Sequence, residues 1–178
     1  VELFALLAEL SKNAPDSQLG IQVEAAYHLV DRMIEARIAA DEATLQDTGH
    51  PEELTRQELA AKKADFTKAA REEVAARLAA ESKKYDGLLG QWLQMDRMFL
   101  DVKLSRNLEA VAKECQVFLG DEPPEFDEPK KDAKPEELAR KMRDDVVRAV
   151  LRQRALVTFT NLSVRQSATP EMRSWLLA

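Results

Sequence analysis

Apolar residues recur every three or four positions along most of this chain, a spacing that places side chains on one face of a helix. Residues 155–164 are rich in β-branched side chains and could form a strand. A lone strand would have nothing to pair with, so we interpret this part as helix too. The pattern predicts helices over residues 1–10, 17–45, 51–84, 88–119 and 136–166, and a short last helix from Pro170.

Three helix starts carry a local signature. Pro51 and Pro135 each open a Pro-Glu-Glu-Leu sequence, and Pro170 follows Thr169, a candidate N-cap. Proline fits the first helical turn, where its missing N–H is not needed, and carboxylates favour the positive end of the helix dipole. We therefore expect helices to begin at these prolines.

Residues 59–85 carry a narrow apolar stripe on an alanine-rich helix. Its members are spaced by seven or four positions, as in a coiled-coil seam, and small alanines let a neighbouring helix approach closely. A patch rich in methionine and aromatic residues follows at 92–99, and such a patch fills a core or forms a groove for a partner helix. The predicted surface for a partner helix consists of Leu59, Phe66, Ala70, Val74, Leu78, Trp92 and Met95.

Gly87 and Gly90 interrupt the long helical stretch 51–119. The apolar spacing continues through both glycines, but Lys83 and Lys84 resemble the end of a helix, where cations meet the last carbonyls. We favour a kink or a very short turn over a straight rod. A turn would fold the two parts into a hairpin, whereas a kink would leave a projecting arm. Residues 1–119 then form the helical core of the bundle, with 51–119 as its long hairpin or arm.

An acidic, proline-rich linker is predicted over residues 120–134. The stretch GDEPPEFDEPKK, which starts at Gly120, holds five carboxylates, and its prolines prevent regular structure. The plain interpretation is a flexible spacer. A second hypothesis is that the linker covers the basic face of the next helix, with Phe126 as an anchor. The C-terminal helices, 135–178, are expected to pack on the bundle.

The helix after the linker is basic, with seven cations against two aspartates between residues 140 and 165. At about 100° per residue, the cations lie opposite Leu138, Met142, Ala149 and Leu156, in a broad apolar arc that also includes Val146, Val150 and Val157. A solvated charged face is the plain interpretation, and a surface for polyanions is the sharper one. Its residues would be Arg140, Lys141, Arg143, Arg148, Arg152 and Arg154.

The sequence holds few signatures of catalysis, and we assign no catalytic residue, metal ligand or cofactor. The chain has no glycine-rich phosphate loop, no Cys-x-x-Cys and no His-Glu-x-x-His. Glu24 and His28 lie one helical turn apart, which allows a metal pair or a phosphotransfer histidine, but an ordinary helical histidine is the simpler interpretation. Cys115 lies on an apolar stripe and is interpreted as a buried structural thiol.

The amino-acid composition indicates a helical protein without a transmembrane segment. Of the residues, 45% are hydrophobic and 33% are charged, with five glycines among 178, which is typical of long helices. A single cysteine excludes an intrachain disulfide, and we expect a reducing, intracellular compartment, cytoplasm or organelle matrix. No apolar run approaches the roughly 20 residues of a transmembrane helix. Both ends look trimmed, so a targeting signal is not readable.

These observations predict an all-α fold, an antiparallel helical bundle with long coiled-coil-like helices. The expected function is that of a non-enzymatic structural or adaptor protein, which binds a protein partner or a second copy through its helices within a larger assembly. The alternative is a polyanion-binding module that uses residues 140–165 to bind nucleic acid or an anionic surface; the net charge of −6 argues mildly against extensive nucleic-acid binding. The third hypothesis is an enzyme or phosphotransfer bundle that uses His28.

Overall fold

The computed structural model describes residues 19–85, 87–120, 134–164, 169, 170 and 174, with side chains from residue 28 onward except those of Arg140 and Arg143. The prediction of an all-α fold is confirmed, since these residues form helices and no strand. The predicted helix 1–10 and the acidic part of the linker, 121–133, lie outside the described residues. Within them the α-helices are α2 (Leu19–Thr48), α3 (Arg56–Glu81), α4 (Gly87–Lys103), α5 (Leu108–Leu119) and α6 (Pro135–Ser163).

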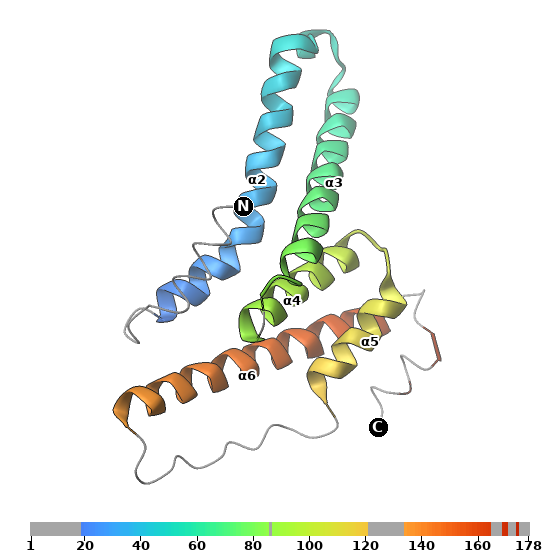
Figure 1. Ribbon diagram of the computed structural model, residues 1–178. Helices are drawn as coiled ribbons and strands as arrows, with labels where there is room; N and C mark the ends of the chain where they lie inside the picture. Colours follow the sequence, from blue (N-terminus) through green and yellow to red (C-terminus); the bar gives the residue numbers. More distant parts are fainter. Residues whose placement is uncertain (1–18, 86, 121–133, 165–168, 171–173, 175–178) are drawn as a thin grey trace.

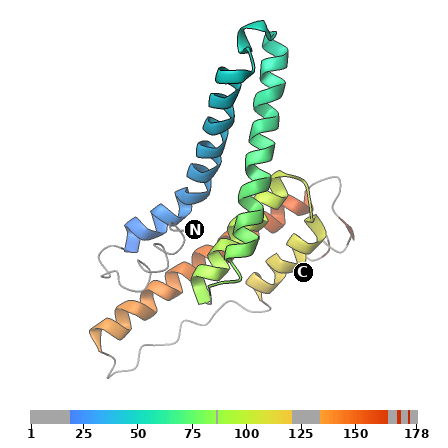
Figure 2. The same ribbon diagram turned by 45° about the horizontal axis from the view of Figure 1, so that its top comes forward.

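The molecule consists of a long helical arm and a more compact body (Figure 1). In the arm, α2 and α3 run side by side in opposite directions, and both views show their connected ends projecting away from the body (Figure 2). In the body, α4 contacts α3 as well as α5 and α6, and α5 packs on α6. Helix α4 therefore joins the two parts.

The tip of the arm corrects one predicted helix start. Pro51 opens only a single 3-10 turn, Pro51–Glu53, and α3 begins later, at Arg56. Thr55 and Glu58 form a capping box, in which the Thr55 hydroxyl accepts from the Glu58 N–H and the Glu58 carboxylate accepts from the Thr55 N–H. This box satisfies two N–H groups that helix starts leave unpaired, so it outcompetes the proline. At Pro135 the prediction is confirmed, because that residue is the first of α6.

The break between α3 and α4 is a short turn. Helix α3 ends at Glu81, and α4 begins at Gly87, whose φ of +72° lies in the left-handed region. Gly90 is needed for a different reason, since a Cβ atom there would lie 2.0 Å from the Tyr85 carbonyl oxygen. The two glycines thus allow α4 to turn back against the end of α3.

A second break, between α4 and α5, was not predicted from the sequence. The continuous helix 88–119 is wrong, because Leu104–Asn107 forms a turn in which Ser105 and Asn107 both have φ of 53°. Asp101 holds this turn from one side: its carbonyl accepts from the Arg106 N–H at 3.0 Å, and its carboxylate accepts from the Arg106 guanidinium. Asp101 is buried and also binds Arg97, so charged groups rather than apolar spacing end α4 here.

Two apolar clusters hold the helices together. The first lies where α2, α3 and α4 meet and consists of Leu29, Val30, Val74, Ala75, Leu78, Leu93 and Leu100. The second lies inside the body, between α4, α5 and α6, and its largest fully buried side chain is Phe159. The predicted helix over 155–164 is thus confirmed up to Ser163, and its β-branched character serves packing rather than a strand.

Helix α6 packs mainly through a face other than the apolar arc that the sequence marks. The side chains of Leu151, Ala155, Phe159 and Leu162 are at most 2% exposed. On the opposite side, Met142, Val146, Leu156 and Val157 are between 48% and 63% exposed. Most of the arc that the sequence marks as the apolar side of α6 therefore faces solvent, whereas Val150, also a member of it, packs against the body.

Candidate partner-binding surface

The exposed apolar side of α6 is the first part of the candidate surface, and we call it the outer arc. Positions 142, 146, 149, 153, 156 and 160 follow one another at alternating intervals of four and three, which is the spacing of a helix-pairing seam. Two of them are polar, Gln153 and Thr160, and both are exposed. The apolar members of the outer arc are Met142, Val146, Ala149, Leu156 and Val157, with Val164 just after the helix end.

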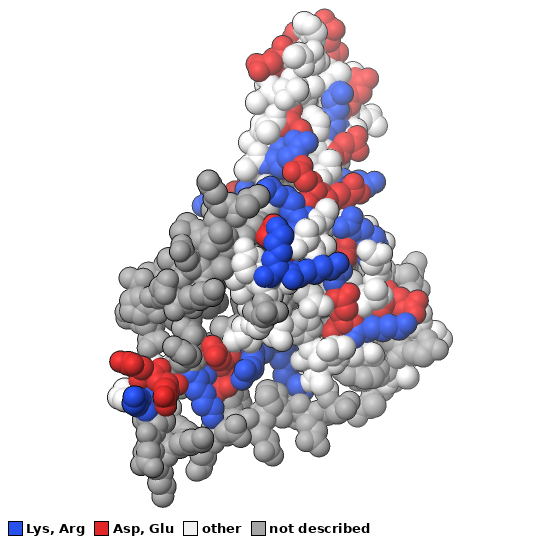
Figure 3. All heavy atoms as spheres, in the orientation of Figure 1, with Lys and Arg blue, Asp and Glu red and all other residues white. Residues whose placement is uncertain are grey.

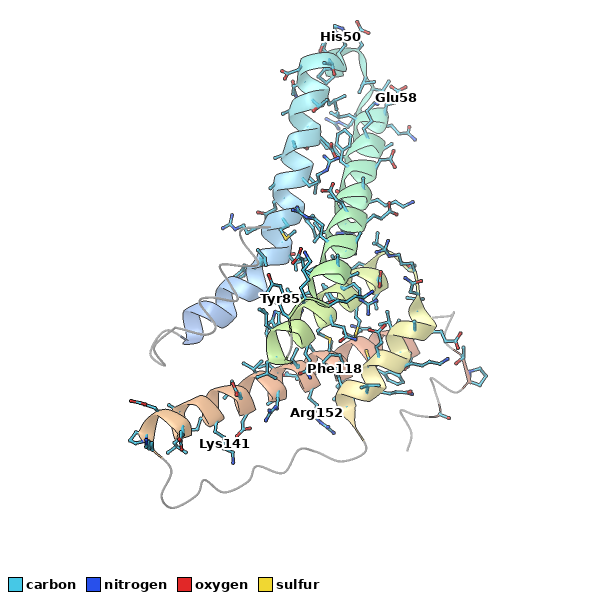
Figure 4. The ribbon with its side chains drawn as sticks, in the orientation of Figure 1. His50, Glu58, Tyr85, Phe118, Lys141 and Arg152 are labelled. Carbon is cyan, nitrogen blue, oxygen red and sulfur yellow. The ribbon has the colours of Figure 1, made fainter. Side chains whose placement is uncertain are left out.

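A row of charged residues borders the outer arc on one side. Lys141, Asp145, Arg148 and Arg152 follow one another at intervals of three or four, and Arg152 precedes Leu156 of the outer arc by one turn. Within this row Arg148 lies 3.5 Å from Asp145, so the two opposite charges are paired. Lys141 and Arg152 project from α6 on the side away from α4 (Figure 4).

A pocket of about 410 Å³ opens beside this flank, between α4, α5 and α6. Leu151 and Phe118 contribute apolar surface, and Arg148 and Arg152 line it from α6. Glu114 lines it from α5, where it accepts hydrogen bonds from Arg97 and, at 2.8 Å, from the amide of Gln94. The one carboxylate of the lining is thus matched by a cation, so Arg148 and Arg152 dominate the charge of the pocket.

Two arginines explain why α6 packs through its inner face, which holds Leu151, Phe159 and Leu162. Arg152 donates to the Leu119 carbonyl at the end of α5. Arg154 donates to Asp96 on α4 at 2.5 Å and lies over the Trp92 ring, 5.0 Å from guanidinium carbon to ring centroid. Both arginines flank the buried face. If the outer arc packed inward instead, the Leu119 carbonyl and the Asp96 carboxylate would lose these hydrogen bonds and would stay buried without a partner.

Asp96 is the most strongly perturbed acid of the body. It is 4% exposed, and its Oδ2 atom has no hydrogen-bond partner among the described residues. Burial raises the pKa of Asp96 to about 6, and the nearby charge of Asp31 adds to this effect, although Arg154 acts in the opposite direction. The carboxylate is held within the fold and has no open face for chemistry.

The residues predicted to face a partner helix are mostly covered by this chain. Ala70, Val74 and Leu78 are buried, and Val74 and Leu78 lie in the cluster with α2 and α4. Trp92 and Met95 are buried in the body. Leu59 and Phe66, nearer the tip of the arm, are partly buried. For most of this set the neighbouring helix belongs to the same chain, and a role in binding another molecule stays a prediction.

Some of the residues predicted to bind anions are engaged within the fold, and another is exposed. Arg154 and Arg152 hold α6 on the body, so their charges serve the fold. Arg148 is 58% exposed and lies 3.5 Å from Asp145. The side chains of Arg140 and Arg143 lie outside the described ones. An anion-binding role for this helix stays a prediction, and of its described cations Arg152 and Arg154 are engaged in holding the fold.

The residues that could carry chemistry are not brought together. Cys115 is fully buried, and this burial raises its thiol pKa to about 12, far from the range of a nucleophile. His28 is exposed on α2. The described residues include no cluster of three or more acids, histidines or cysteines that could hold a metal ion. None of the helices in the described part is long and apolar enough to cross a membrane.

Charge is distributed differently over the arm. Figure 3 shows cations and carboxylates interleaved along α2 and α3. Among the described residues, two ion pairs join these helices: Arg37 with Glu73 at 2.7 Å and Lys63 with Glu42 at 2.9 Å. The arm therefore presents a charged surface of mixed sign, while the outer arc of α6 exposes Met142, Val146, Leu156 and Val157.

Comparison with protein-family models, with curated proteins and with solved structures found no match for this chain. The functional argument accordingly rests on the geometry of α6 and its surroundings.

The sequence did not indicate the outer arc as a binding surface. It showed the arc, but an apolar arc on an amphipathic helix is ordinarily the buried one. The signal for the opposite orientation lies in the partners of Arg152 and Arg154, which are a backbone carbonyl and an acid 58 positions away. Neither partner is visible in a periodic pattern.

Proposed function

We propose that this protein is a non-enzymatic structural or adaptor protein that binds a helix of another molecule through the outer arc of α6, within a larger assembly. The supporting observation is the exposure of the arc: Met142 is 63%, Val146 53% and Leu156 48% exposed, on a seam with helix-pairing spacing. In this proposal the chain is an antiparallel bundle, and the coiled-coil-like pair of α2 and α3 serves as a stiff extension of the body.

Burial inside this chain supports the same assignment by elimination. The seam of α3 is closed by α2 and α4, and the methionine and aromatic residues of α4 lie in the core. Of the apolar surfaces that the sequence indicates, the outer arc keeps its side chains exposed. An amphipathic helix laid on such a seam is a common way to bind a protein partner.

The proposal is tested by selecting binders from a library of helical peptides on the wild-type chain alone, and then measuring their affinity for the double variant V146E/L156E. Both positions are exposed, so this variant is expected to fold. The matched control is A64E/A76E, which adds the same two charges at exposed positions of α3.

Selected peptides should bind the wild-type chain and A64E/A76E equally, and V146E/L156E at least about tenfold more weakly. Sedimentation of the chain alone belongs to the same experiment, because a dimer that V146E/L156E abolishes would identify a second copy as the partner. Peptides that bind all three forms equally, with a monomeric chain, would contradict the proposal.

A further inference from the structure

We propose that the turn between α4 and α5, residues 104–107, is a strained hinge through which two copies of this chain exchange α5 and α6 and form a domain-swapped dimer. The turn has left-handed backbone conformations, yet it lies inside a stretch whose apolar spacing continues as one helix. This exchange does not involve the outer arc, so it goes beyond the proposed function.

The end of α4 has the hydrogen bonds of a Schellman motif without the residue that this motif prefers. The Arg106 N–H donates to the Asp101 carbonyl at 3.0 Å, and the Ser105 N–H donates to the Val102 carbonyl at 3.1 Å. The motif ordinarily has glycine at its left-handed position, because glycine has no Cβ atom to clash there. Here Ser105 occupies that position with a φ of 53°, and Asn107 has the same φ. The turn is therefore strained at Ser105, and a helical conformation would relieve this strain.

The sequence around the turn does not itself end a helix. Residues 104–107, Leu-Ser-Arg-Asn, include neither proline nor glycine, and the Asn107 side chain makes no capping hydrogen bond to α5. Apolar residues continue at helical spacing across the turn, at positions 100, 104, 108, 111, 115 and 118. The turn divides this stripe, since Leu100 packs with α2 and α3 while Val111 and Cys115 pack in the body. One continuous helix over α4 and α5 is therefore compatible with the sequence.

Asp101 holds the turn closed through its side chain. Its carboxylate is buried, and it accepts from Arg97 at 2.8 Å and from Arg106. The contact with Arg106 spans the turn, whereas Arg97 lies one helical turn earlier on α4 itself. On opening, Asp101 would lose Arg106 but keep Arg97, so the buried carboxylate would still have a cation beside it. The ion pair with Arg106 thus favours the closed turn.

A second copy of this chain is the partner that fits the opened form. Straightening the hinge separates α4 from α5 and α6 and would expose the body cluster, which contains Met98 of α4, Val111 of α5 and Phe159 of α6. Helices α5 and α6 pack on each other, so they would move together. Another copy opened in the same way offers the identical α4 face, and the ion pair of Asp96 with Arg154 would form between chains. Exchange therefore restores the buried contacts and relieves the strain of the turn.

The experiment compares the wild-type chain with three variants by sedimentation at rising concentration. Arg106→Leu removes the ion pair across the turn and keeps a good helix former, so it should tighten dimerisation at least about tenfold. S105G/N107G removes the strain and disfavours a continuous helix, so it should stay monomeric. Arg32→Leu is the matched control, because it removes an exposed arginine paired with Glu35 on α2, and it should dimerise like the wild type.

Spin labels distinguish this exchange from any other dimer. Gln91 and Val117 line the same pocket, so labels at Q91C/V117C lie close together in the closed chain. In a continuous helix these positions are separated by about 39 Å. Cys115 is fully buried, so the labels attach at the introduced cysteines. Introduced into the R106L chain and diluted with unlabelled chain, the labels should show the long distance in the dimer, measured by double electron–electron resonance.

Each contrary outcome is distinct. An R106L chain that stays monomeric would overturn the inference, as would an R106L dimer that shows only the short distance. If R106L does not fold, the labelled wild type is refolded from urea at high concentration; the long distance is expected, and the short distance alone would overturn the inference. A dimer that V146E/L156E abolishes would assign self-association to the outer arc instead. Peptide binding to the arc is measured on separate variants, so the proposed function is tested independently of this result.

Discussion

The two faces of α6 differ in what surrounds them rather than in how apolar they are. The inner face packs Leu151, Phe159 and Leu162 into the body, while the outer arc leaves Val146 and Leu156 exposed. Both faces would supply apolar area to a core. What distinguishes the inner face is its border, where Arg152 and Arg154 find a carbonyl and a carboxylate. Polar partners thus select one of two competing apolar faces.

The largest difference between the faces should appear on truncation of Phe159. Phe159→Ala removes a fully buried ring, so it should lower the free energy of unfolding by about 3–5 kcal/mol. Val157→Ala, on the outer arc two positions earlier, should change it by less than about 0.5 kcal/mol. Denaturant unfolding of both variants measures the contrast. Equal losses would mean that both faces are buried in solution.

The second effect concerns pH and tests the border of the inner face. Burial raises the pKa of Asp96 to about 6 from an ordinary value of 3.8. Because the folded-state pKa is the higher one, folding favours the protonated acid, and stability is lost as pH rises from about 4 through 6. By linkage this loss amounts to about 2–3 kcal/mol.

Asp96→Asn isolates this effect, since asparagine does not titrate. The stability of the wild type relative to D96N should fall across that pH window and stay constant above it. The charged groups that act on Asp96 are Arg154 of α6 and Asp31 of α2, and Arg154 keeps its charge throughout. A stability difference that does not change with pH would show that Asp96 is solvated.

A smaller effect separates the two kinds of arginine on α6. Arg154→Leu leaves the buried Asp96 without its cation. It should lower the free energy of unfolding by about 2 kcal/mol at neutral pH, since protonation of the acid limits the loss. Arg148→Leu is the control, and its exposed pair with Asp145 should contribute only about 0–1 kcal/mol. If Arg148→Leu lowers the free energy of unfolding as much as Arg154→Leu does, burial does not distinguish the two arginines.

The smallest expected change is the effect of V146E/L156E on stability. Both side chains are exposed, so the double variant should unfold within about 1 kcal/mol of the wild type while losing its binding to helical peptides. Thermal unfolding, followed by circular dichroism, measures this directly. A strongly destabilised variant would show that the outer arc is covered within the folded chain.

Sequence patterns predicted the helices well where apolar periodicity was long and local. Helix α2 ends three residues after its predicted end, and α6 begins at Pro135 as predicted. The predictions failed where polar groups decide. Thr55 and Glu58 move the start of α3, and Asp101 with Arg106 ends α4. The orientation of α6 depends on contacts between distant residues, which periodicity does not encode.

The central claim, that the outer arc of α6 is the binding surface, is tested most directly by methyl NMR with a helical peptide selected on the wild-type chain. The account predicts that the peptide shifts the methyl signals of Val146, Leu156 and Val157 on the arc. The signals of Leu78, buried against α2 and α4, should stay unchanged. Shifts confined to α2 and α3, with the arc unaffected, would contradict the claim and place the binding surface on the arm.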